Sequence, residues 1–181
     1  MKQSPIQSLV AVNGPAGGGS AWDLTAGVKM LLYGRSGTGK TTFWATCPKP
    51  IMALVCSGGA NPGELRSIDT PENRRSITAA LVGSSDDFRD RVRFADKGTS
   101  SCATLVLDHA TGLQDLVLKE ILGLDEIPVQ KGWGLATQQQ YGQCTLQCKE
   151  LLRSLLSFPG HVVVVAQERE FNADADSELL M

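Results

Sequence analysis

The feature that most constrains this chain is a glycine-rich stretch from Gly34 to Thr41, GRSGTGKT. It fits the pattern G-x-x-x-x-G-K-[ST], in which glycines let several backbone N–H groups converge on one anion. The ammonium group of Lys40 can reach phosphate oxygens, and the Thr41 hydroxyl is an oxygen ligand of the kind that Mg²⁺ binds. The stretch therefore predicts a phosphate-binding loop at the N-terminus of a helix, where the helix dipole favours anions.

The sequence on either side of the loop agrees with this interpretation. Residues 30–33 are an apolar run typical of a buried strand, and residues 41–46 can continue as a helix until Pro48 stops it. The alternative is a glycine turn with an incidental lysine, but strand, loop and helix follow one another in the order that the motif requires. We expect a nucleotide to contact Gly34, Arg35, Ser36, Gly37, Thr38, Gly39, Lys40, Thr41 and Thr42.

Three later apolar runs, residues 51–56, 103–108 and 161–167, predict further strands of a parallel sheet, and a weaker strand is expected at 75–79. Polar residues at the carboxyl ends of such strands face the ligand. Asp108 follows an apolar strand in the Walker B pattern, so it is expected to hold the hydration shell of Mg²⁺ together with Thr41. Gln167 ends the last strand, where its amide could sense a γ-phosphate or merely cap the strand.

Helices are expected between these strands, at residues 84–94, 111–122 and from 137 onward. Two capping boxes, Thr111-x-x-Gln114 and Thr137-x-x-Gln140, mark expected helix starts. The alternation of strands and helices predicts an α/β fold, a three-layer sandwich with a mostly parallel sheet. In the helix at 84–94 an arginine pair could meet nucleic acid, although a solvated face is favoured.

Composition limits the remaining classes of function. A chain of 181 residues suggests one domain, and its net charge of −2 gives no general attraction to nucleic acid. No apolar run reaches the length of a membrane span, so a cytoplasmic protein without a membrane partner is expected. Its five cysteines form no C-x-x-C pair, which predicts reduced thiols and neither a zinc site nor a disulfide framework.

With residues 31–42, 104–108 and 163–170 in place, the sequence resembles the RecA-like P-loop ATPases. More narrowly, it resembles short phage-encoded AAA/RecA-like nucleotide-binding proteins implicated in DNA recombination and single-strand annealing. The resemblance implies a P-loop NTPase domain over residues 28–171, between a flexible segment at 1–27 and an acidic tail at 172–181. It also implies ATP hydrolysis with Mg²⁺, with Lys40, Asp108 and Gln167 as catalytic residues, in the host cell cytoplasm if the protein is phage-encoded.

The same resemblance implies partners. Members assemble into rings or filaments, so a homo-oligomer is expected, and single-stranded DNA would bind loops equivalent to residues 124–134 and the region after Gln167. Three features depart from the family pattern: Ser57 stands where a catalytic glutamate is usual, with Glu64 the nearest acid downstream, and His109 stands where a small hydroxyl residue is common. The core also normally continues with another strand, so a trimmed version with an exposed sheet edge is expected.

The leading hypothesis is therefore a RecA-like ATPase of phage DNA metabolism that couples ATP hydrolysis to single-stranded DNA binding. Ser57 motivates an alternative, a nucleotide-dependent assembly or interaction protein that does not hydrolyse ATP. A third reading is a small-molecule kinase, which would need arginines in a lid over the phosphates. Arg74 and Arg75 are the only compact pair for that role, and the spacing of Asp108 and Gln167 favours the RecA-like layout.

Overall fold

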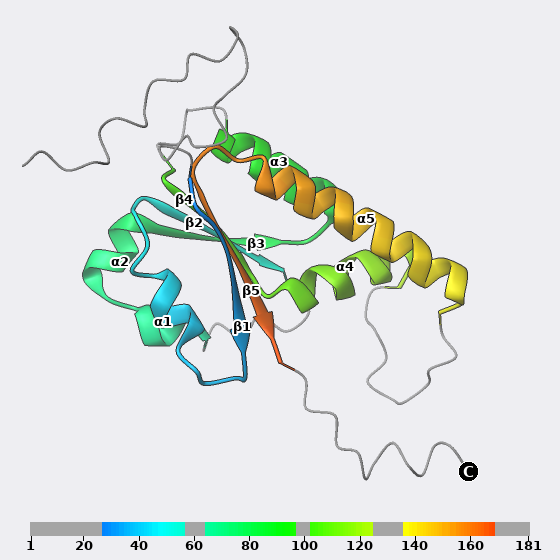
Figure 1. Cartoon of the computed structure of the whole chain (residues 1–181), viewed down its shortest axis with the longest axis horizontal. Coiled ribbons are helices and arrows are strands. Elements are labelled where there is room, and N and C mark those ends of the chain that lie inside the picture. The colour runs from blue at the N-terminus through cyan, green and yellow to red at the C-terminus, as the bar shows by residue number, and fades with distance from the viewer. Residues whose placement is uncertain (1–26, 57–63, 97–101, 125–135, 169–181) are drawn as a thin grey trace, which may run out of the picture.

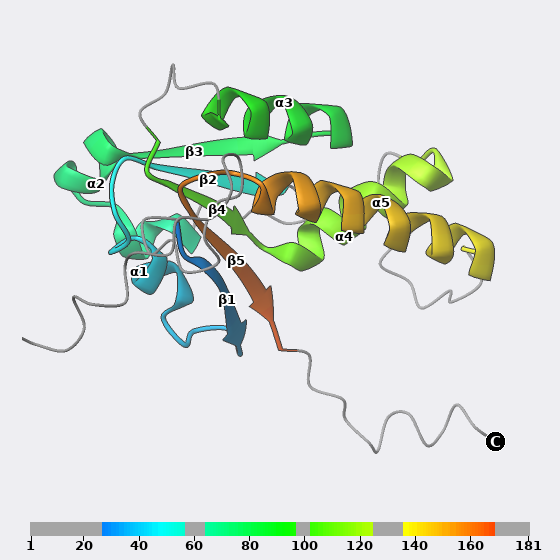
Figure 2. The ribbon, with the colours of Figure 1, turned by 45° about the horizontal axis from the view of Figure 1, so that its top comes forward.

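The computed structural model describes residues 27–56, 64–96, 102–124 and 136–168, and within them five parallel strands form one sheet in the order β1-β5-β4-β2-β3. Figure 2 shows the strands fanning out in this order. The strands are β1 (Lys29–Gly34), β2 (Ile51–Cys56), β3 (Ile77–Val82), β4 (Thr104–Asp108) and β5 (His161–Gln167). The helices are α1 (Lys40–Trp44), the 3₁₀ helix η2 (Glu64–Ile68), α2 (Pro71–Ser76), α3 (Ser85–Asp96), α4 (Ala110–Leu122) and α5 (Gln138–Leu156).

Helices cover both faces of the sheet. The α1 and α2 helices lie on one side, and α3, α4 and α5 lie on the other (Figure 1). Successive side chains of a strand point to opposite faces of the sheet, so alternate residues pack into two separate hydrophobic cores. Leu105 and Leu107 pack with Phe88 beneath α3, α4 and α5, whereas Val106 and Val163 pack with Trp44 of α1. The predicted α/β sandwich is confirmed, and its sheet is parallel at every described pairing.

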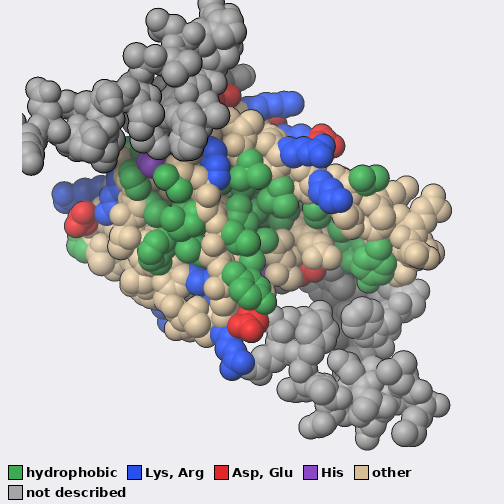
Figure 3. All heavy atoms as spheres, viewed as in Figure 1, with side chains coloured by type: hydrophobic (Ala, Val, Ile, Leu, Met, Phe, Trp, Pro, Cys, Tyr) green, Lys and Arg blue, Asp and Glu red, His purple; other side chains and the backbone are tan. Residues whose placement is uncertain are grey.

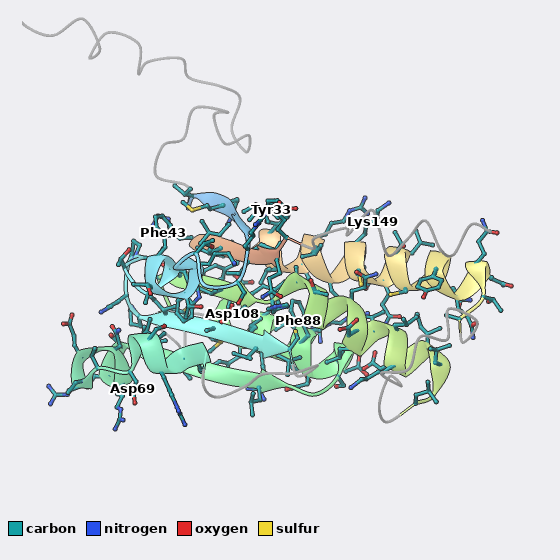
Figure 4. The ribbon with its side chains drawn as sticks, turned by 90° about the horizontal axis from the view of Figure 1, so that it is seen from below. Tyr33, Phe43, Asp69, Phe88, Asp108 and Lys149 are labelled. Atoms are coloured by element: carbon teal, nitrogen blue, oxygen red, sulfur yellow. The ribbon has the colours of Figure 1, made fainter. Side chains whose placement is uncertain are left out.

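The β1 strand lies at one edge of the sheet and pairs only with β5 among the described residues. Leu31 and Tyr33 stand opposite Val164 and Ala166, on the face that α4 and α5 cover elsewhere, and each is 64% exposed. Figure 3 shows hydrophobic side chains gathered across the middle of the visible face of the molecule. Figure 4 shows Tyr33 near the outside of the molecule. Among the described residues, no second strand pairs with β1.

Two local predictions are corrected: one predicted strand starts two residues later than expected, and one capping box does not form. The strand expected at 75–79 begins at Ile77, because α2 occupies residues 71–76. Thr70 caps this helix by accepting from the Asn73 N–H, and Pro71 at the first helical position is pre-set for a helix. The capping box at Thr111 does not form either, since α4 has already begun at Ala110.

One further local prediction is confirmed. The second capping box forms at the start of α5, where Thr137 and Gln140 satisfy each other's backbone N–H groups. All five cysteines are free thiols. Burial, together with nearby negative charge, raises the pKa of the Cys56 thiol to about 12, so this cysteine stays protonated and unreactive at neutral pH. None of the described helices combines the length and apolar character that crossing a membrane requires.

Several expectations fall on residues that the structure does not describe. These are the segments 1–26, 125–135 and 169–181, which include most of the expected N-terminal segment, the expected DNA-binding loops and the acidic tail. Ser57 also lies outside the described residues. The arginine face of α3, by contrast, is described: Arg89 pairs with Asp86 at 2.8 Å, and Arg93 pairs with Asp90 at 3.3 Å. Arg89 also pairs with Glu150 of α5 at 3.4 Å, so both arginines are engaged within the molecule and only Arg93 is largely exposed.

Candidate nucleotide-binding site

The glycine-rich stretch forms a tight loop between β1 and α1. Gly37 and Gly39 have φ angles of 79° and 80°, in the left-handed region that side chains strain. The Thr38 hydroxyl donates to the Arg35 carbonyl oxygen at 2.9 Å, which closes the turn from within. The chain therefore enters α1 directly from a left-handed glycine, and the first N–H groups of the helix are left open to an anion.

Lys40, the first residue of α1, folds back over this loop. Its ammonium group donates to the carbonyl oxygens of Gly34 at 2.8 Å and Arg35 at 2.5 Å, and lies 3.4 Å from the Thr38 hydroxyl. All of these partners are uncharged, and no described carboxylate pairs with Lys40. The loop thus holds a positive charge that only neutral groups solvate, as a binding site for phosphate requires.

The loop opens into a cavity of about 320 Å³ at the carboxyl edge of the sheet. This volume is in the range of small-ligand sites in proteins. The lining residues come from the loop, α1, η2 and the ends of β4 and β5: Ser36, Gly37, Gly39, Lys40, Thr41, Thr42, Ser67, Asp108, His109, Val165 and Gln167. Gly34, Arg35 and Thr38 do not line the cavity; they shape the loop and bind Lys40.

Asp108 and Gln167 reach this cavity because of the order of the strands. Since β5 lies between β1 and β4, Gln167 stands beside the phosphate loop, in register with Gly34, and Asp108 lies one strand farther on. Asp108 is only 5% exposed, and Figure 4 shows it in the interior of the molecule. The structure thus brings together the residues that the sequence predicted at separate strand ends.

The oxygen atoms around the cavity suit Mg²⁺. Mg²⁺ keeps several waters and binds through one or two protein groups together with phosphate oxygens. The Thr41 hydroxyl and the Asp108 carboxylate line the same cavity and supply such groups. The described residues contain no cluster of three His, Cys, Asp or Glu side chains that could hold a metal alone. This donor set fits a magnesium ion that arrives with a nucleotide, and it does not fit a structural zinc ion.

Asp108 is also the sole carboxylate among the described residues that line the cavity. Glu64 begins η2, but its side chain lies outside what the structure describes. Three lining residues, Ser67, His109 and Val165, were not expected at the site. Ser67 lies on a short 3₁₀ helix that leaves no periodic pattern in the sequence, whereas His109 directly follows the end of β4 and could have been found by its position there.

Comparison with known proteins agrees with this geometry. Residues 26–178 match the sequence model of a family described as the AAA domain. No protein with a curated function matches the chain. The family match covers most of the chain, including the phosphate-binding loop and the strands that end at Asp108 and Gln167. The chain therefore belongs to the AAA domain family of P-loop nucleotide-binding proteins.

Proposed function

We propose that this protein binds ATP with Mg²⁺ in the cavity at the carboxyl edge of its sheet and hydrolyses it. The observation that carries the proposal is the convergence of Lys40, Thr41, Asp108 and Gln167 on one cavity that begins at a glycine loop. The loop amides and the Lys40 ammonium group would bind the phosphates. The family match supports nucleotide binding independently of the cavity.

In this proposal each residue either stabilises negative charge on the phosphates or orients the groups that react. A bound Mg²⁺ would neutralise negative charge on the β- and γ-phosphates. Thr41 and Asp108 would orient it and its waters, Lys40 would stabilise the charge that develops as the terminal phosphate leaves, and Gln167 would donate to that phosphate. Among the described residues that line the cavity, only Asp108 offers a carboxylate for the attacking water. An arginine from a neighbouring copy would complete the stabilisation, so the proposal includes a homo-oligomer.

The proposal extends to a biological setting, phage DNA recombination or single-strand annealing, in which hydrolysis is coupled to single-stranded DNA. This part is supported by the resemblance of the sequence and by the place of Gln167. That residue ends β5 inside the cavity, and residue 169 begins the segment that we expect to contact DNA. In this proposal Gln167 would link the state of the nucleotide to the proposed DNA-binding segment.

Lys40→Ala tests the proposal. Loss of the ammonium group should weaken binding of a fluorescent ATP analogue about 100-fold, because a charge-assisted contact to phosphate is worth about 1.5–3 kcal/mol and Lys40 is the only Lys or Arg among the described residues that line the cavity. Lys149→Ala is the matched control, since Lys149 is exposed on α5 and does not line the cavity. Equal affinity of Lys40→Ala and the native protein for ATP would show that nucleotide binds elsewhere or not at all.

A second candidate function is nucleotide-dependent assembly without hydrolysis. The observation that favours it is the single described carboxylate of the cavity, together with Ser57 at the position where a catalytic glutamate is usual. Phosphate release measured with and without a single-stranded oligonucleotide separates the two. If the protein is an ATPase, a single-stranded oligonucleotide should stimulate phosphate release, and Lys40→Ala should abolish it. If it is an assembly protein, ATP should change the size of the assembly without phosphate release.

We do not propose a kinase, because Arg74 is held by Asp69 at 2.5 Å and neither Arg74 nor Arg75 lines the cavity.

A further inference from the structure

His109 is an unusual residue for its position in the chain. Its backbone has φ 91° and ψ 85°, and it is the one non-glycine residue with positive φ among those described. It also stands at the N-cap of α4, where Ser, Asp, Asn or Gly would serve the helix better, and its side chain makes no capping hydrogen bond. A bulky side chain in a left-handed conformation persists only where the surrounding structure holds it, and such residues cluster at functional sites. Neither the positive φ angle nor the N-cap position of α4 therefore explains why this residue is a histidine.

The imidazole instead contacts Gln167. His109 Nε2 lies 2.9 Å from Gln167 Oε1, which joins the carboxyl end of β4 to that of β5. With the amide oxygen facing the ring, the His109 tautomer that carries its hydrogen on Nε2 donates to Gln167 Oε1, since an amide oxygen can only accept. In that tautomer the contact holds the Gln167 amide with its oxygen toward the ring. No described residue accepts a hydrogen bond from the NH₂ group of Gln167, and both side chains line the cavity that contains Lys40.

We propose that His109 is a positioning residue that makes the site prefer a nucleoside triphosphate to a diphosphate. It holds the oxygen of the Gln167 amide, so that the NH₂ group is presented to the terminal phosphate. Without the imidazole the amide rotates freely and can present its oxygen, which repels phosphate. The diphosphate lacks the terminal group, and its binding does not depend on the orientation of the amide. This inference rests on the proposed function, because it concerns the same cavity.

His109→Gly is the variant that tests it. Glycine adopts positive φ without strain, so the turn between β4 and α4 is kept while the imidazole is removed. We expect the affinity for ATP, measured with Mg²⁺ by titration calorimetry, to fall roughly tenfold, the usual effect of losing one hydrogen bond to a charged group. The affinity for ADP should stay within about twofold. His109→Asn should behave in the same way, since asparagine tolerates the left-handed backbone and is too short to replace the imidazole; it also serves if the glycine variant does not fold.

A double-mutant cycle shows whether His109 acts through Gln167. Gln167→Ala should cause a similar loss of ATP affinity, and adding His109→Gly to it should cause no further loss. His161→Asn is the control at the other end of β5, where the ring Nδ1 accepts from the Val28 N–H at 3.1 Å. That variant should leave the ratio of ATP to ADP affinity unchanged, whatever it does to stability.

The outcomes separate this inference from the function on which it rests. If the native protein binds neither ATP nor ADP, both fall together. If the native protein binds ATP and Lys40→Ala does not, the proposed function stands, and the histidine variants then decide the inference alone. An equal loss of ATP and ADP affinity in His109→Gly, no loss at all, or additive losses with Gln167→Ala would each overturn it.

Discussion

The amino ends and the carboxyl ends of the five strands, here called the amino edge and the carboxyl edge of the sheet, are built in opposite ways. At the amino edge, backbone and side chains satisfy one another: Lys29 Nζ donates to the Phe158 and Gly160 carbonyl oxygens, and the His161 N–H donates to Ala103 O at 2.9 Å. Gly160 is packed so closely there that a Cβ atom would lie 2.6 Å from Ala103 O. At the carboxyl edge the strands end around a cavity of about 320 Å³.

The backbone geometry follows the same division. Gly37 and Gly39, at the carboxyl edge, have left-handed backbones, and a Cβ at either would have no atom within 4 Å. His109 is at this edge too. The polar groups of the amino edge bond to one another, whereas several of those at the carboxyl edge line the cavity. Substitutions at the first edge should therefore change the free energy of unfolding, and substitutions at the second should change binding.

Gly160→Ala should have the largest effect on stability. The new Cβ atom would lie 2.5 Å from the Phe158 ring and 2.6 Å from Ala103 O, and a backbone oxygen cannot move aside cheaply. We expect a loss of about 2 to 3 kcal/mol in the free energy of unfolding, measured by urea denaturation, with ATP affinity of the folded protein unchanged.

Gly142→Ala is the matched control for this substitution. Gly142 is exposed inside α5, and a Cβ there meets nothing within 4 Å. Since alanine favours helix over glycine, this variant should be more stable by about 0.5 to 1 kcal/mol. If Gly160→Ala were as stable as Gly142→Ala, the amino edge would not be closely packed.

Asp108→Asn probes the carboxyl edge. The carboxamide keeps the shape of the carboxylate but loses its charge, so Mg²⁺ should promote ATP binding about 10- to 100-fold less well than in the native protein. In EDTA the two proteins should bind ATP equally. Asp69→Asn is the control, since Asp69 pairs with Arg74 outside the cavity. A magnesium dependence that Asp108→Asn leaves intact would place the metal on other residues.

Lys29→Met should have the smallest of these effects. It removes two hydrogen bonds from the amino edge, to Phe158 O and Gly160 O, but leaves the aliphatic part of the side chain in place. Because Lys29 is exposed, the effect should be small: we expect the free energy of unfolding, measured by thermal denaturation, to fall by about 1 kcal/mol. Lys149→Met, on an exposed face of α5, should change stability by less than about 0.5 kcal/mol. Weakened ATP binding in Lys29→Met would contradict the division between the edges.

The sequence by itself determined the parts of this protein that depend on local pattern. The glycine spacing predicts the loop, and the apolar runs before Asp108 and Gln167 predict β4 and β5, because a strand of a parallel sheet must be buried along its length. The capping box at Thr137 predicts the start of α5 for an equally local reason. Where two local signals competed, as at residues 70–79, the Thr70–Pro71 helix start displaced the expected strand.

Only the tertiary structure decided which strands are neighbours and therefore which side chains meet. An apolar run records that a strand is buried, but not which strand lies beside it, because pairing joins residues far apart in the chain. The place of β5 between β1 and β4 sets Gln167 beside the phosphate loop and brings it within 2.9 Å of His109, 58 positions earlier in the chain. The hydrogen bonds of the amino edge likewise join segments that lie far apart in the chain, so no local sequence pattern predicts them.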